Sequence, residues 1–594
     1  MNSEPAVIRD DADIPDCGHA DKNAAPWLAL SCCLIAVAVQ MVDMTIVNIA
    51  LPSLGTDLGA SSGQQLLVLT AYTLAFACTL LTASRIGERI GRRRVFIAAL
   101  AGFTAISVLC GLAQGPTELI ALRALQGGFA ALASAQTIAI ISASFPKSRH
   151  GIVFGIYGAT AGVAAMLGPT LGGLLISADA FGLGWRTIFL VNLPLGILAC
   201  AVGYRHLPAL SSTSRPDLDA TGIALSSAGL FLLIYPLATG RENGWPTWQL
   251  AMVASSIALL ALFALHEYRL AARGGDPLLK PELFRIRSFA IGSVLSLLFF
   301  SVFAAFFFTV SVTAQFGLGF SPLRTGLLTL PFALGAAVGS LISPLMVGWI
   351  GPRTLSVGAV AFTGSLIYTA LIVEPSTGID IPTIIAPLII GGFGMGLFVA
   401  PLQATMLSGT SERNVGSASG TVPTIQQIGA SVGLAVISLL FFNQVAAESD
   451  SAVSAARESL TRDIANTKVA EPLRPFVINE FTRCASAQLG SPRPDAPGPG
   501  CPDTRAPADR AANSASPEDV RESVTADAEP ALRPAARQAA SQTFLAAFDV
   551  ILWVLAGITI TLGALTFGLR RRASPAMSTA AMSTAADISD SALR

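Results

Sequence analysis

Long apolar runs recur throughout this chain of 594 residues, and each is long enough to cross a lipid bilayer. A helix rises about 1.5 Å per residue, so about 20 residues cross a hydrocarbon core about 30 Å thick. The sequence therefore predicts an all-α integral membrane protein with fourteen transmembrane helices. The runs are 27–51, 63–83, 94–114, 118–145, 152–177, 187–207, 219–238, 248–270, 288–313, 323–348, 355–374, 383–407, 416–443 and 544–569.

Composition excludes several function classes. Only 12% of the residues are charged and 52% are apolar, which excludes a soluble enzyme. The formal net charge is zero, so we expect no nucleic-acid partner. The chain has no phosphate-binding loop motif in a suitable context and no His/Cys cluster with the spacing of metal ligands. We therefore expect no ATP-driven activity, no metal site and no cofactor.

The arginines and lysines predict the orientation in the membrane. Nineteen of the 37 lie at or directly after the ends of even-numbered runs, including five arginines within 85–94 and three at 570–572. The short loops on the other side carry only Arg186, Arg241 and Arg324. By the positive-inside rule we expect a multi-pass protein of the plasma (inner) membrane with both termini in the cytoplasm.

Three polar segments lie outside the apolar runs. Residues 1–26 and 573–594 are predicted to be disordered cytoplasmic tails. Residues 444–543 are predicted to form an extracellular loop, with an amphipathic helix near Val445–Val469 and a Pro-rich remainder that cannot bury a core. Cys484 and Cys501 in this loop are candidates for a disulfide in an oxidising compartment; the alternative is two free thiols.

Asp43 is the residue that points most directly to chemistry. It lies in the stretch Met41–Pro52, nine residues before Pro52 and thus about 13 Å along the first predicted helix from that end. A carboxylate at membrane depth is costly and marks a proton or substrate pathway. Burial favours its protonated form and a nearby cation its ionised form, so a balanced site can gain and lose a proton. The alternative is an acid that is hydrated at the outer interface.

Arg123 in the fourth run is the candidate cation for Asp43. An intramembrane arginine needs a partner, and Asp43 is the only carboxylate well inside the early runs. Gln126 and Gln40 are candidates to complete a polar cluster. The alternative is that Arg123, about five residues into its run, extends to the outer interface.

The loop Ser84–Arg94 is a tight basic turn whose simplest role is to fix topology. Gly87 and Gly91 are expected to permit the turn. Glu88 lies among the arginines, where it could meet a helix N-terminus and hold two helices together.

The fifth run contains closely spaced glycines. Gly168, Pro169, Gly172 and Gly173 follow three earlier glycines of the same run. Small residues at helical spacing let helix backbones approach closely, and the proline bends the helix. The alternative is ordinary membrane packing.

Together these motifs resemble those of fourteen-helix drug:proton antiporters of the major facilitator superfamily. The resemblance extends over about residues 27–443 and the last helix. The segments that carry it are Met41–Pro52, Ser84–Arg94, Leu122–Gly127, Gly155–Gly173, Trp185–Gly196, Pro277–Phe289 and Ser321–Gly326.

The resemblance implies two six-helix bundles plus an inserted helix pair. Their predicted segments are 27–210, an inserted pair with its linker at 211–287, 288–443, and a final helix at 544–572. It also implies alternating access, driven by the proton gradient without a cofactor, in an expected monomer.

The resemblance also assigns roles to residues. Asp43 and Arg123 would couple transport to protons. The remaining assignments are a cytoplasmic gate of Glu88, Arg89, Gly91 and Arg92, an antiporter motif of Gly168, Pro169, Gly172 and Gly173, and a substrate cavity lined by Tyr72, Gln126, Gln136, Phe303, Phe306, Gln403 and Gln426.

The sequence departs from the family pattern at Ser84 and Glu88, where the family usually has Gly and Asp. Helices nine to thirteen carry no central acid, so we expect neutral, zwitterionic or monocationic substrates. The predicted function is proton-coupled multidrug or antibiotic efflux of amphipathic small molecules from the cytoplasm or inner leaflet. The alternatives are a dedicated exporter of an endogenous metabolite or lipid, and a membrane scaffold that acts through the long outer loop.

Overall fold

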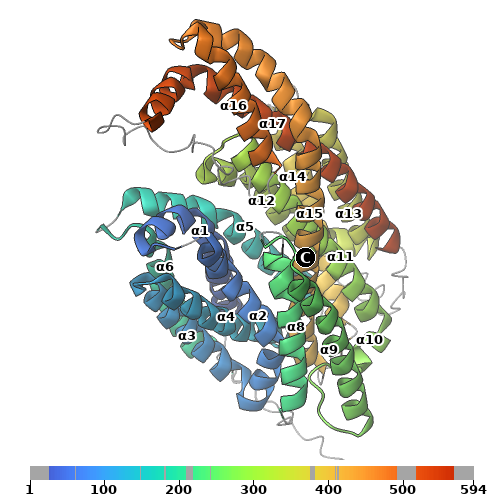
Figure 1. The fold of residues 1–594 in the computed structure, drawn as a ribbon. Helices are drawn as coiled ribbons and strands as arrows, with labels where there is room; N and C mark the ends of the chain where they lie inside the picture. The colour runs from blue at the N-terminus through green and yellow to red at the C-terminus, as the bar shows by residue number, and fades with distance from the viewer. Residues whose placement is uncertain are drawn as a thin grey trace, which may run out of the picture.

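A computed structural model describes residues 26–60, 62–146, 149–179, 182–208, 218–240, 243–374, 381–408, 410, 414–490 and 517–566. Over these residues the elements are helices (Figure 1). Within this described part of the chain, fourteen helical segments are long and apolar enough to cross a membrane, which confirms the predicted all-α architecture. The elements are α1 (Pro26–Leu58), α2 (Ser62–Ile90), α3 (Arg92–Leu112), α4 (Pro116–Ser144), α5 (His150–Ala178), η3 (Gly184–Arg186), α6 (Thr187–Leu190), α7 (Asn192–His206), α8 (Ala220–Thr239), α9 (Thr247–Ala272), α10 (Glu282–Arg285), α11 (Arg287–Val312), η4 (Thr313–Gly317), α12 (Pro322–Ile350), α13 (Arg353–Ile372), α14 (Ile381–Ser408), α15 (Val415–Asp463), η6 (Ile464–Asn466), η7 (Glu471–Leu473), α16 (Arg474–Leu489) and α17 (Pro517–Thr566).

The helices group into two bundles with an extra pair beside them (Figure 1). Helices α1 to α7 pack on one another, with α2 on α4 and α1 on α5, and form the N-terminal bundle. Helices α11 to α15 and α17 form the C-terminal bundle. The two bundles meet along α5 and α12 and along α2 and α15. Helices α8 and α9 pack together, and α8 also contacts α2 and α15, so the inserted pair lies where the bundles meet.

The segment between the last two membrane helices is more ordered than its composition suggests. Helix α15 continues to Asp463 and α17 begins at Pro517, so they have 49 and 50 residues, or about 75 Å each. The expected amphipathic helix near 445–469 is therefore the outer half of α15. With α16 these outer halves form a helical extension, residues 444–490 and 517–543, at the top of Figure 1.

The described part of this extension has an apolar core, so the prediction that the remainder after the amphipathic helix cannot bury one is wrong for its described residues. Val453, Leu460, Val477 and Phe481 are all less than a tenth exposed. Alanines of α17, including Ala531 and Ala535, are buried with them. Because α15 and α17 are already anchored in the bundle, a narrow stripe of apolar residues is enough to hold their outer halves together.

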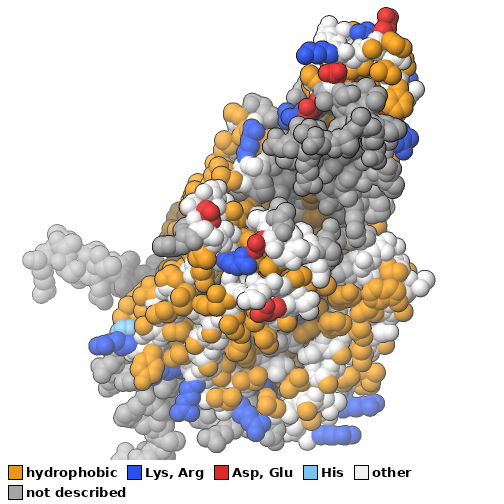
Figure 2. Space-filling model, turned by 60° about the vertical axis from the view of Figure 1, so that its left-hand side comes forward, with side chains coloured by type: hydrophobic (Ala, Val, Ile, Leu, Met, Phe, Trp, Pro, Cys, Tyr) orange, Lys and Arg blue, Asp and Glu red, His pale blue; other side chains and the backbone are white. Residues whose placement is uncertain are grey.

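The outer surface of the bundles is strongly apolar. Large side chains such as Leu345, Val360 and Leu371 are more than half exposed. Figure 2 shows hydrophobic side chains over much of the lower body, with Lys and Arg side chains along its lower edge. An apolar wall with a basic rim is what a lipid-facing surface requires.

Candidate functional site: a buried ion pair in the N-terminal bundle

Asp43 and Arg123 form a direct ion pair inside the N-terminal bundle. Arg123 Nη1 donates to Asp43 Oδ2 at 2.7 Å, and the two side chains are 1% and 0% exposed. They come from α1 and α4. The two alternatives were that Asp43 is hydrated at the outer interface and that Arg123 extends to it. Both require an exposed side chain, and neither side chain is exposed.

Two amides complete the polar shell of Asp43. Gln126, one turn after Arg123 on α4, donates to Asp43 Oδ1 at 2.9 Å. Asn192 at the start of α7 donates to the same oxygen at 2.8 Å. Arg123 Nη1 also donates to Gln126 Oε1 at 2.8 Å, and its Nε donates to the Val68 carbonyl at 3.3 Å. The carboxylate thus accepts three hydrogen bonds, one at Oδ2 and two at Oδ1.

Aromatic rings cover the guanidinium. The Arg123 carbon Cζ lies 4.4 Å from the centre of the Tyr72 ring and 5.8 Å from that of Phe189. Ring faces are electron-rich, so they stabilise a cation that is withdrawn from water. Tyr72 is itself 2% exposed. The tyrosine predicted to line a cavity therefore belongs to the ion-pair site in this structure.

Sequence reasoning missed Asn192. It lies in the sixth apolar run, between Val191 and Leu193. A polar amide inside an apolar run needs a hydrogen-bond partner, as the Asp43 carboxylate does. Its Nδ2 also donates to Ser107 on α3 at 3.0 Å. Asn192 Oδ1 is buried without a hydrogen-bond partner among the described residues. Gln40, the other amide proposed for the cluster, instead donates to the Ala130 carbonyl.

The hydrogen bonds of the pair depend on the charge of Asp43. Each Asp43 oxygen faces a donor, and arginine does not give up its proton in proteins. Three of the roughly four acceptor positions of the carboxylate are filled, so a proton can bind at the open position of Oδ2, but it removes the negative charge that strengthens all three hydrogen bonds. Loss of the negative charge also leaves Arg123 buried without its counter-ion, which is strongly unfavourable.

The other predicted cavity residues separate into two groups. Phe306 is 1% exposed and packs against Phe307, Phe332 and Phe362 in the C-terminal bundle, so in this structure it is a core residue. Gln136 is also buried and donates to the Ala83 carbonyl, which joins α4 to α2. The remaining predicted cavity residues are Phe303 and Gln426, both partly exposed, and Gln403, which is 8% exposed.

Glu88 lies between the two bundles. It pairs with Arg85 at 2.7 Å, and a side-chain carbon added at Gly416 would collide with its carboxylate. Gly416 is the second residue of α15, so the carboxylate lies at a helix N-terminus, where unpaired N–H groups favour a negative charge. The sequence suggested this arrangement, and here it joins α2 to α15.

The other residues of the predicted gate have different surroundings. Gly91, with φ of 109°, makes the turn between α2 and α3. Gly87 lies inside α2 against Gln136, so the expectation that it also permits the turn is wrong. Arg92 donates to the Ala139 carbonyl at 3.4 Å, whereas Arg89 is exposed.

Helix α5 is held between the bundles by its small residues. Added side-chain carbons at Gly168 and Gly172 would overlap Thr45 and Ile46 of α1. Gly173 instead faces Leu323 of α12. Pro169 approaches Gly326 of α12. A side-chain carbon added at Gly326 would lie 3.2 Å from the Cβ of Pro169. The motif therefore allows α5 to approach one helix in each bundle.

The C-terminal end of α1 carries a second ion pair, between Asp57 and Arg186. Asp57 Oδ2 accepts hydrogen bonds from Arg186 at 2.5 Å and from Trp185 at 3.0 Å. These bonds hold the pKa of the Asp57 carboxyl below its ordinary value. Asp57 is about half exposed, so this pair, unlike the buried one, is screened by water.

Cys484 lies on α16 of the helical extension and is disulfide-bonded. Cys501 lies outside the described residues, so its pairing with Cys484 stays a prediction. The predicted tails at 1–26 and 573–594 lie, except for Pro26, outside the described residues as well.

Comparison with known proteins places this chain among membrane transporters. The family model described as Major Facilitator Superfamily matches residues 33–434. The chain is 35% identical over 498 residues to a probable actinorhodin transporter of Streptomyces coelicolor, covering 82% of this chain and 86% of that protein. It is 37% identical to a puromycin resistance protein of Streptomyces alboniger, covering 71% and 83%.

Further similarities agree with this assignment. A cephamycin export protein of Amycolatopsis lactamdurans is 32% identical, covering 71% of this chain and 86% of that protein. The crystal structure of the human organic anion transporter MFSD10 (TETRAN) matches with a TM-score of 0.51 at 16% identity, covering 69% of this chain and 92% of that one. At that identity the match supports the fold alone.

Proposed function

This chain belongs to the major facilitator superfamily, and from that premise we propose that it exports amphipathic small molecules in exchange for protons. Substrates would enter from the cytoplasm or the inner leaflet and leave on the outer side of the plasma membrane. The observation that carries the proposal is the buried pair of Asp43 and Arg123. A carboxylate buried at membrane depth marks a proton or substrate pathway.

The exchange cycle follows from the contacts of the pair. In the ionised state Asp43 holds α1, α4 and α7 together through Arg123, Gln126 and Asn192. Protonation from outside would release these contacts and favour opening of the α2–α15 closure at Glu88 and Gly416. Substrate would then bind from the cytoplasmic side, and loss of the proton to the cytoplasm would restore the pair and the outward-facing state.

The relatives narrow the substrate class that we propose. Those named above are a probable actinorhodin transporter, a puromycin resistance protein and a cephamycin export protein. We propose a substrate of that size and amphipathic character. Two of these relatives are named for transport of one compound, which favours a dedicated natural-product exporter as the second candidate.

A transport assay tests the proton-coupled role. Cells or proteoliposomes with wild type, Asp43→Asn or Asp57→Asn are loaded with a panel of fluorescent dyes and antibiotics, with and without a protonophore. Asp57 is a matched control because it lies on the same helix and is partly exposed. We expect wild type and Asp57→Asn to export until the protonophore is added, and Asp43→Asn to export nothing. Undiminished efflux by Asp43→Asn would refute the coupling role, and export of a single compound would favour the dedicated exporter.

A further inference from the structure

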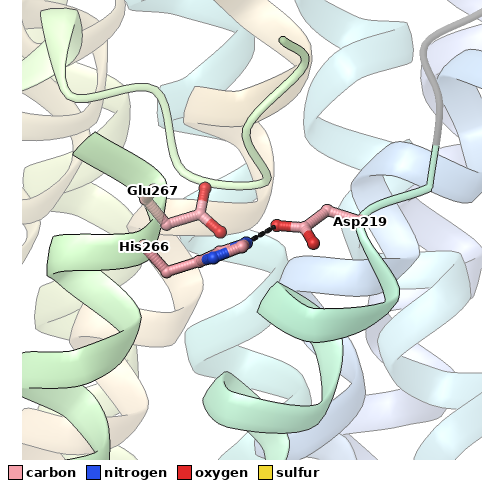
Figure 3. Close-up of side chains that lie close together, drawn as sticks. All are labelled: Asp219, His266 and Glu267. Carbon is pink, nitrogen blue, oxygen red and sulfur yellow. Dashed lines mark hydrogen bonds and ion pairs between the residues drawn. The ribbon is translucent and has the colours of Figure 1, made fainter. Parts of the chain in front are cut away.

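Three side chains that could ligate a metal meet where the inserted helices α8 and α9 come together (Figure 3). Asp219 directly precedes α8, and His266 and Glu267 are in the last two turns of α9. His266 Nε2 and Asp219 Oδ2 are 2.7 Å apart, and Figure 3 shows the Glu267 carboxylate directed into the same space. Since 47 residues separate Asp219 from His266, the spacing that predicted no metal site could not show this group.

Glu267 is the residue that indicates a ligand. It is 1% exposed, and although its Oε2 accepts from the Leu279 amide, its Oε1 is buried with no hydrogen-bond partner among the described residues. A buried carboxylate oxygen without a partner is costly, because desolvation is not compensated. Arg85 on α2 is close enough to interact with Glu267, but it makes no hydrogen bond with it: its Nη1 pairs with Glu88, and its Nε and Nη2 have no hydrogen-bond partner among the described residues.

Gly222 keeps the space between the two carboxylates open. A side-chain carbon at this position would overlap Asp219 Oδ2 and would lie 2.5 Å from Glu267 Oε1. Both oxygens therefore border one small volume, which only glycine leaves unfilled.

We propose that Asp219, His266 and Glu267 bind a divalent transition-metal ion, with Zn²⁺ as the reference ion. The three ligating atoms all lie within 4.8 Å of one another. Ligands at about 2.1 Å from one ion lie at most about 4.2 Å apart, so small side-chain rotations complete the site. The two carboxylates and a neutral imidazole carry two negative charges, which a divalent ion balances, and one nitrogen with two oxygens suits Zn²⁺ or Mn²⁺ better than Mg²⁺.

Such an ion would link Asp219, directly before α8, to His266 and Glu267 near the end of α9. Glu267 also accepts from Leu279, and Leu278 packs with Leu81 of α2 and Phe263 of α9. The ion would therefore fix the inserted pair and the following linker against the N-terminal bundle. This is a structural role, separate from proton coupling at Asp43.

Metal binding to the full-length protein tests the site. The protein is purified with an affinity tag that contains no histidine, stripped with a chelator, and titrated with ZnCl₂, MnCl₂ or MgCl₂ by calorimetry and by thermal unfolding. Wild type should show one saturating Zn²⁺ site and a rise in Tm. His266→Ala and Asp219→Asn should each weaken Zn²⁺ binding at least about 10-fold.

Two further variants sharpen the result. His206→Ala removes a histidine from the end of α7, away from the cluster, and should bind Zn²⁺ as wild type does. Gly222→Ala keeps all three ligands but fills the space between the carboxylates, and should also lose binding. Absence of saturable Zn²⁺ binding, equal affinity in wild type and His266→Ala, or Mg²⁺ bound as tightly as Zn²⁺ would each overturn the proposal.

Discussion

Neutralising Asp43 should destabilise the protein, and neutralising Arg123 as well should restore its stability. The charges are 2.7 Å apart, so at an effective dielectric constant of about 20 their attraction is about 6 kcal/mol before desolvation is subtracted. In Asp43→Asn the new amide has one oxygen, yet the site offers donors to both positions. Arg123 loses its acceptor in one orientation, and Gln126 and Asn192 both lose theirs in the other, while Arg123 keeps a buried charge.

Removing one partner of a buried pair costs about 3–5 kcal/mol. The cost should fall toward the lower end here, because Arg123 keeps its contacts with Gln126, the Val68 carbonyl and the Tyr72 ring. The double variant Asp43→Asn/Arg123→Gln removes both charges, and we expect its stability to lie within about 1 kcal/mol of wild type. Its proton-driven export should nevertheless remain absent.

Denaturant unfolding in mixed micelles, followed by tryptophan fluorescence, gives the four free energies of a double-mutant cycle. Asp57→Asn is the matched control, and it should change stability by less than about 1 kcal/mol at neutral pH. The reasoning fails if Asp43→Asn is as stable as wild type. It also fails if the double variant is no more stable than the single one.

Three further outcomes are expected elsewhere in the molecule. Gly416→Ala should displace Glu88 and increase hydrogen–deuterium exchange at the start of α15, whereas Gly348→Ala, whose added carbon would meet no atom within 4 Å, should not. The loss of stability in Asp57→Asn should be present above about pH 4, the ordinary carboxyl pKa, and should disappear as the pH falls through the lowered pKa of Asp57. Unfolding measured in steps from pH 7 downwards would follow this, and a loss that stays constant at every pH would contradict it. Leu460→Ala should destabilise the helical extension by about 2–5 kcal/mol and increase its proteolysis, while export continues; loss of export would give the extension a part in transport.

Several parts of the fold and site follow from sequence because they depend on local chemistry. The apolar runs predict the membrane helices, since length and composition alone determine whether a segment can cross lipid. Asp43 and Arg123 were paired correctly because buried charges of opposite sign in early helices have few other ways to lower their energy. Glu88 was similarly placed at a helix N-terminus, although the sequence did not identify α15 as that helix.

Other features depend on which helices meet, and only the tertiary structure decided them. Asn192 binds Asp43 from a position 149 residues away in the sequence. Phe306 lies in a core to which other helices contribute, so the sequence of its own helix does not predict its burial. Asp219 and His266 meet because α8 and α9 pack together. The sequence by itself determined which segments enter lipid and which charges need partners, because desolvation acts on each residue wherever it lies. The choice of partner depends on helix packing, which long-range contacts determine.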